Sequence, residues 1–277
     1  KPVGSFICLG PTGVGKTHIA KKIAELMFGS EDSLIRVDMS EFQEKHSLSR
    51  LIGSPPGYVG YNEGGQFTEK VRQKPYSLIL FDEIEKGHKD IFNVLLQILD
   101  DGYVTDASGR KINFRNTLIM MTSNIGVKQS QDFGGGLGFT TKATQQTDKE
   151  RVRTIISKTL KDTFNPEFLN RLDDIIFFES SEGPSIKKIV RLELSFLVDR
   201  LKDKKYVVKF GPSVVDHISE IGYDSKFGAR PLKRAIQSEI EDFISEEILK
   251  GSLVEGVSYS VGYNKTSEKF KLTEKDN

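Results

Sequence analysis

The chain of 277 residues is long enough for one large domain or two ordinary ones, each with its own core. Hydrophobic residues make up 37% of it and charged residues 29%, which is typical of a soluble globular protein. Forty basic against 39 acidic side chains give a formal net charge of +1, so there is no bulk positive charge to hold a polyanion. Nucleic acid is therefore disfavoured as the main partner.

The cysteine and histidine content excludes two further classes of site. Cys8 is the single cysteine and cannot form an internal disulfide, and its setting in SFICLG predicts a buried strand residue in a reducing compartment. His18, His46, His88 and His217 have no metal-ligand spacing, and no apolar run is long enough to cross a membrane. The chain lacks a signal peptide and begins abruptly at a strand, so we expect a piece of a longer protein.

Short apolar runs alternate with helical patterns over the first two thirds of the chain. The predicted strands are SFICLG (5–10), LIRVD (34–38), SLILFDE (77–83), NTLIMMTSN (116–124) and DIIFF (174–178), and the predicted helices include 17–28 and 90–102. A further helix has apolar positions Val152, Ile155, Ile156 and Leu160, and Pro166 closes it. Such alternation predicts an α/β fold, with a parallel sheet covered by helices on both faces.

The pattern changes after SSEGPS at 180–185. A helix, the strand YVVKF and another helix precede a long amphipathic helix from about Pro231 to Lys250, with Gly251 suited to its C-terminal cap. Two short strands, VSYSVGY and KFKLT, finish the chain. We expect a large α/β domain over residues 1–179 and a small α+β domain over 180–277.

A P-loop pattern lies between the first strand and the first helix. GPTGVGKT fits G-x-x-x-x-G-K-[ST], the Walker A motif, in which backbone amides turn onto a phosphate chain. Lys16 would reach the outer phosphates, and Thr17 would ligate magnesium. The alternative is a glycine-rich turn with a surface lysine. The residues expected to bind ATP or ADP are Gly10, Pro11, Thr12, Gly13, Val14, Gly15, Lys16 and Thr17, together with Asp82.

Two carboxylates at the end of SLILFDE support hydrolysis. Asp82 would hold the hydrated magnesium ion, and Glu83 would polarise the attacking water. An Asp-Glu pair after an apolar run is weak evidence alone, because strand ends are often polar. Together with the P-loop it favours hydrolysis over nucleotide binding alone.

Several longer motifs carry a family resemblance. They are RVDMSEFQEKHSLSRLIGSPPGYVGYNEGG, LILFDEIEKGH, TSNIG, FNPEFLNRLDD and FGARPLKR. With them, essentially the whole chain resembles the second ATPase module of the Clp-family AAA+ protein unfoldases, and it is most similar to the ClpC type. The resemblance implies a P-loop AAA+ core with a small C-terminal domain, assembled as a homohexameric ring.

The resemblance also implies roles for three polar residues. Asn124 matches the first sensor, which contacts the γ-phosphate or the attacking water. Arg171 matches the arginine finger, which reaches the nucleotide of the neighbouring subunit. Arg230 matches the second sensor on the small domain and would couple the ATP state to the angle between domains. Without the resemblance, Asn124 would be a turn-forming residue, Arg171 would belong to a surface ion pair, and Arg230 would be a solvated arginine at the start of a helix.

Aromatic residues in two loops match the family's substrate contacts. Tyr58 and Val59, in GSPPGYVGYNEGG, match the pore loop that grips an extended polypeptide, and Tyr103 matches a second pore loop at 100–114. The alternative is a tyrosine that packs back on its own domain.

The stretch DFGGGLGFTTK places two apolar residues among glycines. Leu137, Gly138 and Phe139 match the loop tip with which protease-associated members dock on the ClpP peptidase ring. The alternative is an ordinary loop, since stand-alone disaggregases of the family lack this tip.

These matches imply an ATP-hydrolysing chaperone that unfolds tagged or unfolded proteins, directly or through adaptors, and delivers them to the peptidase. The alternatives are a disaggregase, or an assembly module with weak nucleotide affinity, because the upstream segment that cradles adenine is missing. No membrane partner is expected. We expect location in the bacterial cytoplasm, with an organelle matrix or stroma as alternatives.

Overall fold

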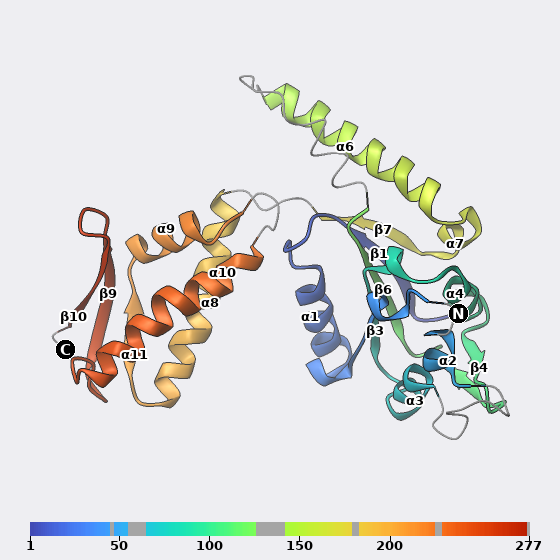
Figure 1. Cartoon of the computed structure of the whole chain (residues 1–277), viewed down its shortest axis with the longest axis horizontal. Coiled ribbons are helices and arrows are strands. Elements are labelled where there is room, and N and C mark those ends of the chain that lie inside the picture. The colour runs from blue at the N-terminus through green and yellow to red at the C-terminus, as the bar shows by residue number, and fades with distance from the viewer. Residues whose placement is uncertain (45–46, 55–64, 126–141, 179–182, 225–228, 276–277) are drawn as a thin grey trace. The chain divides into compact units, whose positions relative to one another are not determined.

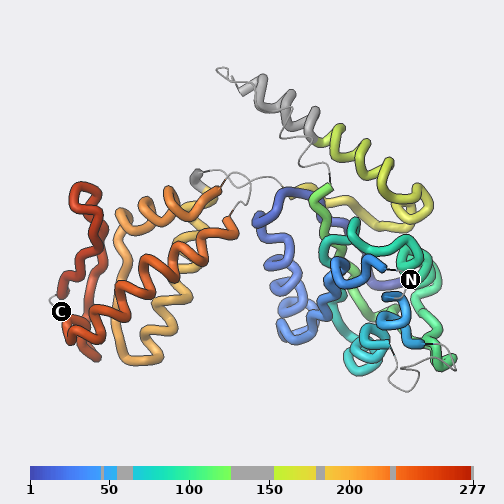
Figure 2. The backbone as a smooth tube through the Cα atoms, in the orientation of Figure 1, coloured from blue at the N-terminus to red at the C-terminus, as the bar shows by residue number. Residues whose placement is uncertain are grey.

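The computed structural model describes residues 1–44, 47–54, 65–125, 142–178, 183–224 and 229–275 (Figure 1). The chain divides into two compact units. One comprises residues 1–10 and 15–178, and the other comprises residues 11–14 and 179–277. Figure 2 traces the backbone of each unit.

A parallel sheet forms the centre of the first unit. In the described part of the chain it has five strands in the order β2-β3-β6-β1-β7. The strands are β1 (Gly4–Leu9), β2 (Leu34–Asp38), β3 (Leu78–Asp82), β6 (Leu118–Ser123) and β7 (Asp174–Phe177). Each overlaps a run predicted to be a strand, and only β1 begins outside its run, one residue early at Gly4, so the predicted α/β class is confirmed.

Helices cover both faces of this sheet. They are α1 (Lys16–Phe28), α2 (Ser47–Ile52), α3 (Gln66–Gln73), α4 (Lys89–Asp101), α6 (Lys142–Thr163) and α7 (Pro166–Arg171), with short 3₁₀ segments at η1 (Glu31–Ser33), η2 (Met39–Phe42) and η4 (Ile84–Lys86). The helix predicted from its apolar positions begins at Lys142, ten residues before Val152, and ends at Thr163. Pro166 lies in the first turn of α7, which Asn165 caps, so a new helix begins there.

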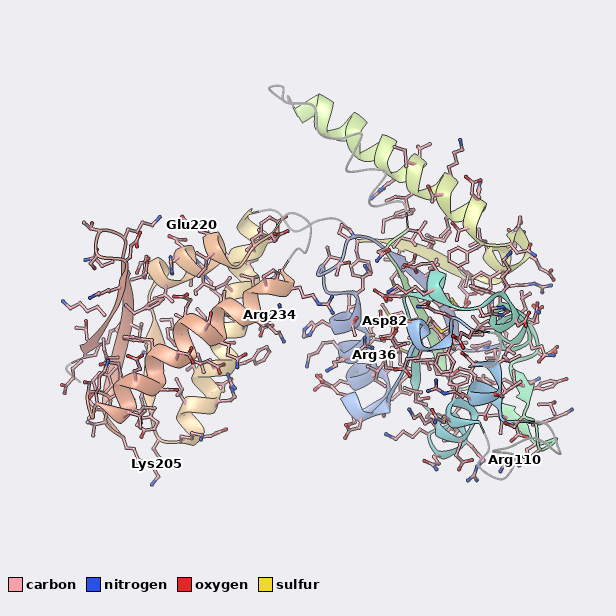
Figure 3. All side chains as sticks on the ribbon, viewed as in Figure 1. Arg36, Asp82, Arg110, Lys205, Glu220 and Arg234 are labelled. Atoms are coloured by element: carbon pink, nitrogen blue, oxygen red, sulfur yellow. The ribbon has the colours of Figure 1, made fainter. Side chains whose placement is uncertain are left out.

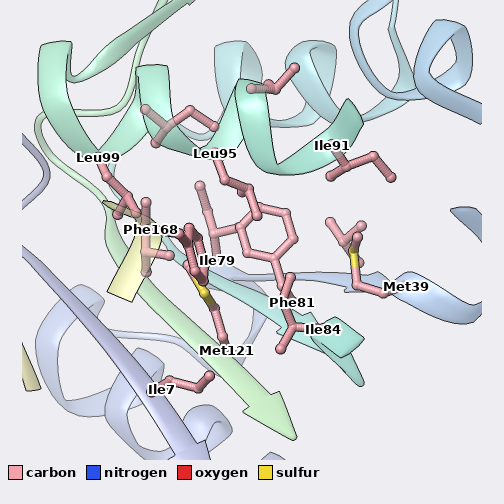
Figure 4. Close-up of a cluster of buried hydrophobic side chains, with 14 of the residues drawn as sticks. Ile7, Met39, Ile79, Phe81, Ile84, Ile91, Leu95, Leu99, Met121 and Phe168 are labelled. Carbon is pink, nitrogen blue, oxygen red and sulfur yellow. The ribbon is translucent and has the colours of Figure 1, made fainter. Parts of the chain in front are cut away.

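Alternate residues of the buried strands explain why two helical layers are needed. Leu78 and Leu80 of β3 pack in one cluster with Cys8 and with Ala20 of α1. Their neighbours Ile79 and Phe81 belong to a larger cluster on the opposite face, together with residues from α2, α3, α4, α6 and α7. Figure 4 shows Leu95 and Leu99 of α4 above Ile79, Phe81 and Met121. Because both faces carry apolar side chains, both must be covered.

A small hairpin differs from the sequence expectation. The segment 100–114, expected only as a loop, contains β4 (Tyr103–Thr105) and β5 (Lys111–Asn113), which pair antiparallel. Val104 and Ile112 face each other across the pair and are buried in the larger cluster. The alternation of apolar and polar residues does not predict these two strands, because each has three residues and only one of them is buried.

The second unit is α+β, as predicted. Its helices are α8 (Gly183–Asp203), α9 (Pro212–Ile221), α10 (Arg230–Ala235) and α11 (Asp242–Leu249), and its strands are β8 (Val207–Phe210), β9 (Ser258–Asn264) and β10 (Lys269–Glu274). In the described residues β9 lies between β8 and β10, parallel to β8 and antiparallel to β10. Gly251 follows the last helix with φ +74°, as expected of a C-terminal cap residue.

The long helix predicted from Pro231 to Lys250 contains a π-helical stretch, η5 (Ile236–Glu241). The buried residues Leu232, Ile236, Ile240 and Ile244 recur every four positions. Four residues make slightly more than one turn of an α-helix and slightly less than one turn of the wider π-helix. Side chains spaced by four therefore shift around the helix axis in opposite directions in the two kinds of turn. Mixing the two turns therefore keeps these four side chains on one face of the core.

None of the helices in the described ranges combines the length and the apolar composition needed to cross a bilayer.

Candidate functional site

The strand order brings three sequence-predicted segments to one edge of the sheet. β6 lies between β3 and β1, so the carboxyl ends that lead to Glu83, Asn124 and Gly10 are neighbours. The backbone N–H of Gly10 donates to the carbonyl oxygen of Ser123 at 3.3 Å. Ligands of open parallel sheets bind at this edge, so the P-loop and the two polar strand ends lie where nucleotide chemistry is expected.

The P-loop leads directly into α1. Gly15 has φ +96°, a left-handed conformation that favours glycine, and α1 begins at Lys16. The Lys16 ammonium donates to the carbonyl oxygen of Gly10 at 2.6 Å, so the lysine folds back across its own loop. Gly10 has φ +154°, and a Cβ there would lie 2.4 Å from the carbonyl oxygen of Phe178. The loop therefore has the glycines that its tight path requires.

The charge on Lys16 is poorly solvated. Burial lowers the pKa of Lys16, and the negative charges of Glu85 and Asp82 oppose that shift. Burying an ammonium costs free energy that a bound anion offsets. A lysine so placed at a helix N-terminus is suited to a phosphate group.

Asp82 is held by partners on both neighbouring strands. The Thr122 hydroxyl of β6 donates to Asp82 Oδ1. The Arg36 guanidinium of β2 donates to Asp82 Oδ2 from Nε at 3.0 Å and from Nη2 at 2.6 Å. The Asp82 side chain is only 12% exposed. A buried carboxylate that already attracts a cation fits the role of holding magnesium, with the Thr17 hydroxyl as the second predicted ligand.

Glu83 has an unusual backbone conformation. Its φ of 55° is left-handed, which costs a non-glycine residue roughly 1–2 kcal/mol. Its backbone N–H donates to Thr122 Oγ1 at 3.1 Å, and its carboxylate forms an ion pair with Lys86. Because such strain persists only where the surroundings enforce it, it supports a functional position for Glu83.

Asn124 contacts a residue in the turn that follows β3. Its backbone N–H donates to Glu85 Oε1 at 3.3 Å. Among the described residues, buried Glu85 Oε2 has no hydrogen-bond partner. Glu85 thus ties the end of β6 to the turn after β3 and adds negative charge near Lys16.

Three residues of this site, Arg36, Thr122 and Glu85, were not predicted from the sequence. Arg36 is one of two charged residues in the run LIRVD, and Thr122 is one of several polar residues at the end of NTLIMMTSN. Their contacts depend on the pairing between strands, which these short patterns do not encode. Glu85 follows Glu83 by two positions, and only its burial and its contact with Asn124 distinguish it from a solvated side chain.

Of the other predicted residues, the structure describes Arg171, Arg230 and Tyr103, and five lie outside the described ranges. Arg171 ends α7 and forms an ion pair with Asp100 of α4. Arg230 begins α10 of the second unit and is exposed. Tyr103 is half-buried in β4, with the Lys111 ammonium 4.8 Å from its ring centre. The remaining predicted positions, Tyr58, Val59, Leu137, Gly138 and Phe139, lie outside the described residues.

Comparison with known families gives matches over both units. The AAA domain (Cdc48 subfamily) matches residues 1–175, and the C-terminal D2-small domain of ClpB protein matches residues 183–261. The chain belongs to the Clp-type AAA+ ATPases.

Curated Clp relatives are similar along nearly the whole chain. The "ATP-dependent Clp protease ATP-binding subunit ClpC" of Staphylococcus saprophyticus is 51% identical over 280 residues, covering 99% of this chain and 33% of the relative. The protein of the same name from Staphylococcus aureus (strain USA300) is 52% identical over 279 residues, with the same coverage. The chain thus spans about a third of the length of these relatives.

A solved structure shares the fold. It is described as a closed-state cryo-EM reconstruction of Hsp104:ATPyS and FITC casein, and it matches with a TM-score of 0.82 and 36% identity. The match covers 99% of this chain and 45% of the other. The P-loop AAA+ core and the small C-terminal domain inferred from the sequence are therefore confirmed, and the chain is an ATPase module of the Clp type.

Proposed function

We propose that the chain is the ATP-hydrolysing module of a homohexameric ring unfoldase that threads proteins through its axial pore and delivers them to a ClpP-type peptidase. The observation that carries this proposal is the similarity to ClpC proteins over 99% of the chain, because those relatives are described as ATP-binding subunits of a Clp protease. The structural neighbour is described with ATPyS and FITC casein, a nucleotide analogue and a protein, which supports polypeptide as the substrate.

The residues at the sheet edge supply the proposed ATP chemistry. Lys16 and the P-loop amides hold the phosphates, while Asp82 and Thr17 hold magnesium, which when bound would neutralise phosphate charge. Glu83 accepts a proton from the attacking water, and Asn124 orients that water or the γ-phosphate. Arg171 acts on the nucleotide of the next subunit, and Arg230 responds to nucleotide from the small domain.

A substrate-gripping pore and a docking tip complete the proposal. Tyr58 and Val59, with Tyr103 in a second loop, contact the translocating chain. Leu137, Gly138 and Phe139 dock on the peptidase. The second candidate function is a disaggregase, because the structural neighbour is described with a nucleotide analogue and a protein and its description names no peptidase. We place the protein in the bacterial cytoplasm, as the ClpC relatives come from staphylococci.

The deciding experiment uses the protein at its full natural length. It compares wild type with two double variants for peptidase binding and for degradation of an unfolded reporter protein. A Leu137→Ala, Phe139→Ala double variant is expected to lose peptidase capture and coupled degradation of an unfolded reporter while ATPase activity continues. A matched double variant, Leu26→Ala with Phe196→Ala, removes the same side-chain types from positions that are 84% and 44% exposed, and should behave as wild type. If wild type itself captures no peptidase, the disaggregase is the better assignment.

The pore assignment has a separate test. Tyr58→Ala is expected to keep ATPase activity but stop unfolding of a stably folded reporter. Tyr76→Ala is the control, because Tyr76 is 65% exposed and follows α3 outside the predicted loops. Continued unfolding by the Tyr58 variant would remove this residue from the pore.

A further inference from the structure

Arg36 contacts Asp82 because of the register between β2 and β3. Asp38 pairs with Asp82 across these parallel strands, and Arg36 lies two residues before Asp38 on the same face. Arg36 is therefore the diagonal neighbour of Asp82, within reach of a long side chain. Figure 3 labels both residues in the first unit.

The contact uses the part of Asp82 that Thr122 leaves open. Thr122 donates to Oδ1, whereas Nε and Nη2 of Arg36 both donate to Oδ2. A carboxylate oxygen has two lone pairs, so these two donors fill Oδ2. A divalent cation on the same carboxylate would lie close to the guanidinium charge and would be repelled by it. Arg36 and a metal ion are thus alternatives at Asp82.

A second carboxylate, that of Asp38, lies close to the Arg36 guanidinium. The Arg36 side chain is 52% exposed, and Nη2 is 3.9 Å from Asp38 Oδ2. The Asp38 carboxylate is fixed by donation from the hydroxyl and N–H of Ser40, and these bonds lower its pKa. Asp38 therefore remains ionised at neutral pH and offers a second acceptor beside the first.

We propose that Arg36 is the internal counter-cation of Asp82 in the metal-free state and competes with magnesium for this carboxylate, so that Arg36 sets the magnesium concentration at which nucleotide binds tightly. The inference rests on the proposed nucleotide site, and it assigns a role to a residue that is not among the predicted site residues. Arg36 would keep the buried carboxylate neutralised until nucleotide arrives with its metal.

The test measures equilibrium binding of a fluorescent ADP analogue as magnesium is titrated. Arg36→Gln should lower the magnesium concentration at half-maximal binding by about tenfold, the effect of removing a charge-assisted hydrogen bond. Arg36→Lys should shift it less, because one ammonium replaces a two-donor contact.

Arg72→Gln is the matched control. Arg72 is 54% exposed and donates to the Glu69 carboxylate from Nε at 2.9 Å and from Nη2 at 2.6 Å, on α3 rather than at the site. Its magnesium midpoint should equal that of wild type.

A second readout needs neither nucleotide nor activity. In EDTA, Arg36→Gln should lower the midpoint of urea denaturation, because a mostly buried carboxylate loses its counter-charge. In an Asp82→Asn background the same substitution should have little effect, as a double-mutant cycle would show.

The outcomes separate this inference from the proposed function. Nucleotide binding with an unchanged or higher magnesium midpoint in Arg36→Gln would overturn the role of Arg36 and leave the nucleotide site intact. Failure of wild type to bind nucleotide at any magnesium concentration would overturn both.

Discussion

Arg171, the last residue of α7, forms an ion pair with Asp100 near the end of α4. Both side chains are partly exposed, at 46% and 31%. Pairs of this kind contribute only about 0–1 kcal/mol to stability, because solvent screens the charges and ordering the side chains costs entropy. The contact orients Arg171 but contributes little to stability. The guanidinium can therefore leave Asp100 at small cost and act on the nucleotide of the next subunit, as proposed.

Arg171→Ala is therefore expected to lower ATP turnover by about 10³-fold or more, the usual effect of losing an arginine finger, while nucleotide affinity is retained. Steady-state phosphate release and equilibrium nucleotide binding check the two parts. Asp100→Asn is the control, because it removes the same ion pair but keeps Arg171. If both variants lose turnover equally, the ion pair and not a finger explains the effect.

Glu83→Gln should bind ATP and hydrolyse it about 10²–10⁴-fold more slowly, because the amide cannot take a proton from water. Single-turnover hydrolysis with prebound ATP measures this. Glu69→Gln on α3 is the control and should turn over normally.

Mixing these two variants tests whether the finger acts between subunits. In an equal mixture of Arg171→Ala and Glu83→Gln chains, about a quarter of the interfaces join an intact Glu83 to a neighbour with an intact Arg171. Turnover should rise above that of either variant alone. A mixture as inactive as its components would place both residues in the same subunit's site.

The sequence predicted well what depends on local pattern. SLILFDE predicted both the buried strand β3 and the position of Asp82 at its end, because uninterrupted apolar runs of this length are typical of parallel strands. The glycine spacing of GPTGVGKT likewise predicts a tight turn into a helix, and Gly15 has the left-handed φ of +96° that such a turn requires.

Contacts made by strand pairing could not be predicted. Nothing local to LIRVD indicates that Arg36 donates to Asp82, since that contact requires β2 to pair with β3 in one register. Thr122 meets Asp82 only because β6 enters the sheet beside β3. The π-helical stretch arises from packing in the small unit, where four side chains must share one face. The roles of Tyr58 and Phe139 stay predictions.

Gly10→Ala should destabilise the first unit. The new Cβ would lie 2.4 Å from the Phe178 carbonyl oxygen, and φ is +154°, so both backbone strain and a backbone clash oppose it. We expect a loss of about 2–4 kcal/mol in the free energy of unfolding, measured by urea denaturation. Gly29→Ala separates the two causes, because φ is +81° there and, apart from its chain neighbours, no atom of the described residues lies within 4 Å of the new Cβ. It should cost only about 1 kcal/mol, and equal losses would exclude a clash at Gly10.

Cys8 provides a pH-dependent probe of the same unit. Burial raises the pKa of its thiol to about 12, although the nearby positive charge of Lys16 opposes the shift. At pH 8 the native thiol should therefore react with a maleimide about 10³-fold more slowly than in urea, where the pKa returns to about 8.5. Because Cys8 is the single cysteine, mass spectrometry after timed labelling reports this site alone.

The sign of the pH effect on stability follows from the same pKa. The folded state holds the Cys8 proton more tightly than the unfolded state, so the stabilisation is fully present below the unfolded pKa of about 8.5 and decreases as the pH rises toward 12. Cys8→Ala keeps a small apolar residue and should weaken the dependence of the urea midpoint on pH between about 9 and 11. Fast native labelling at pH 8, or an unchanged pH dependence in this variant, would contradict a buried, protonated thiol.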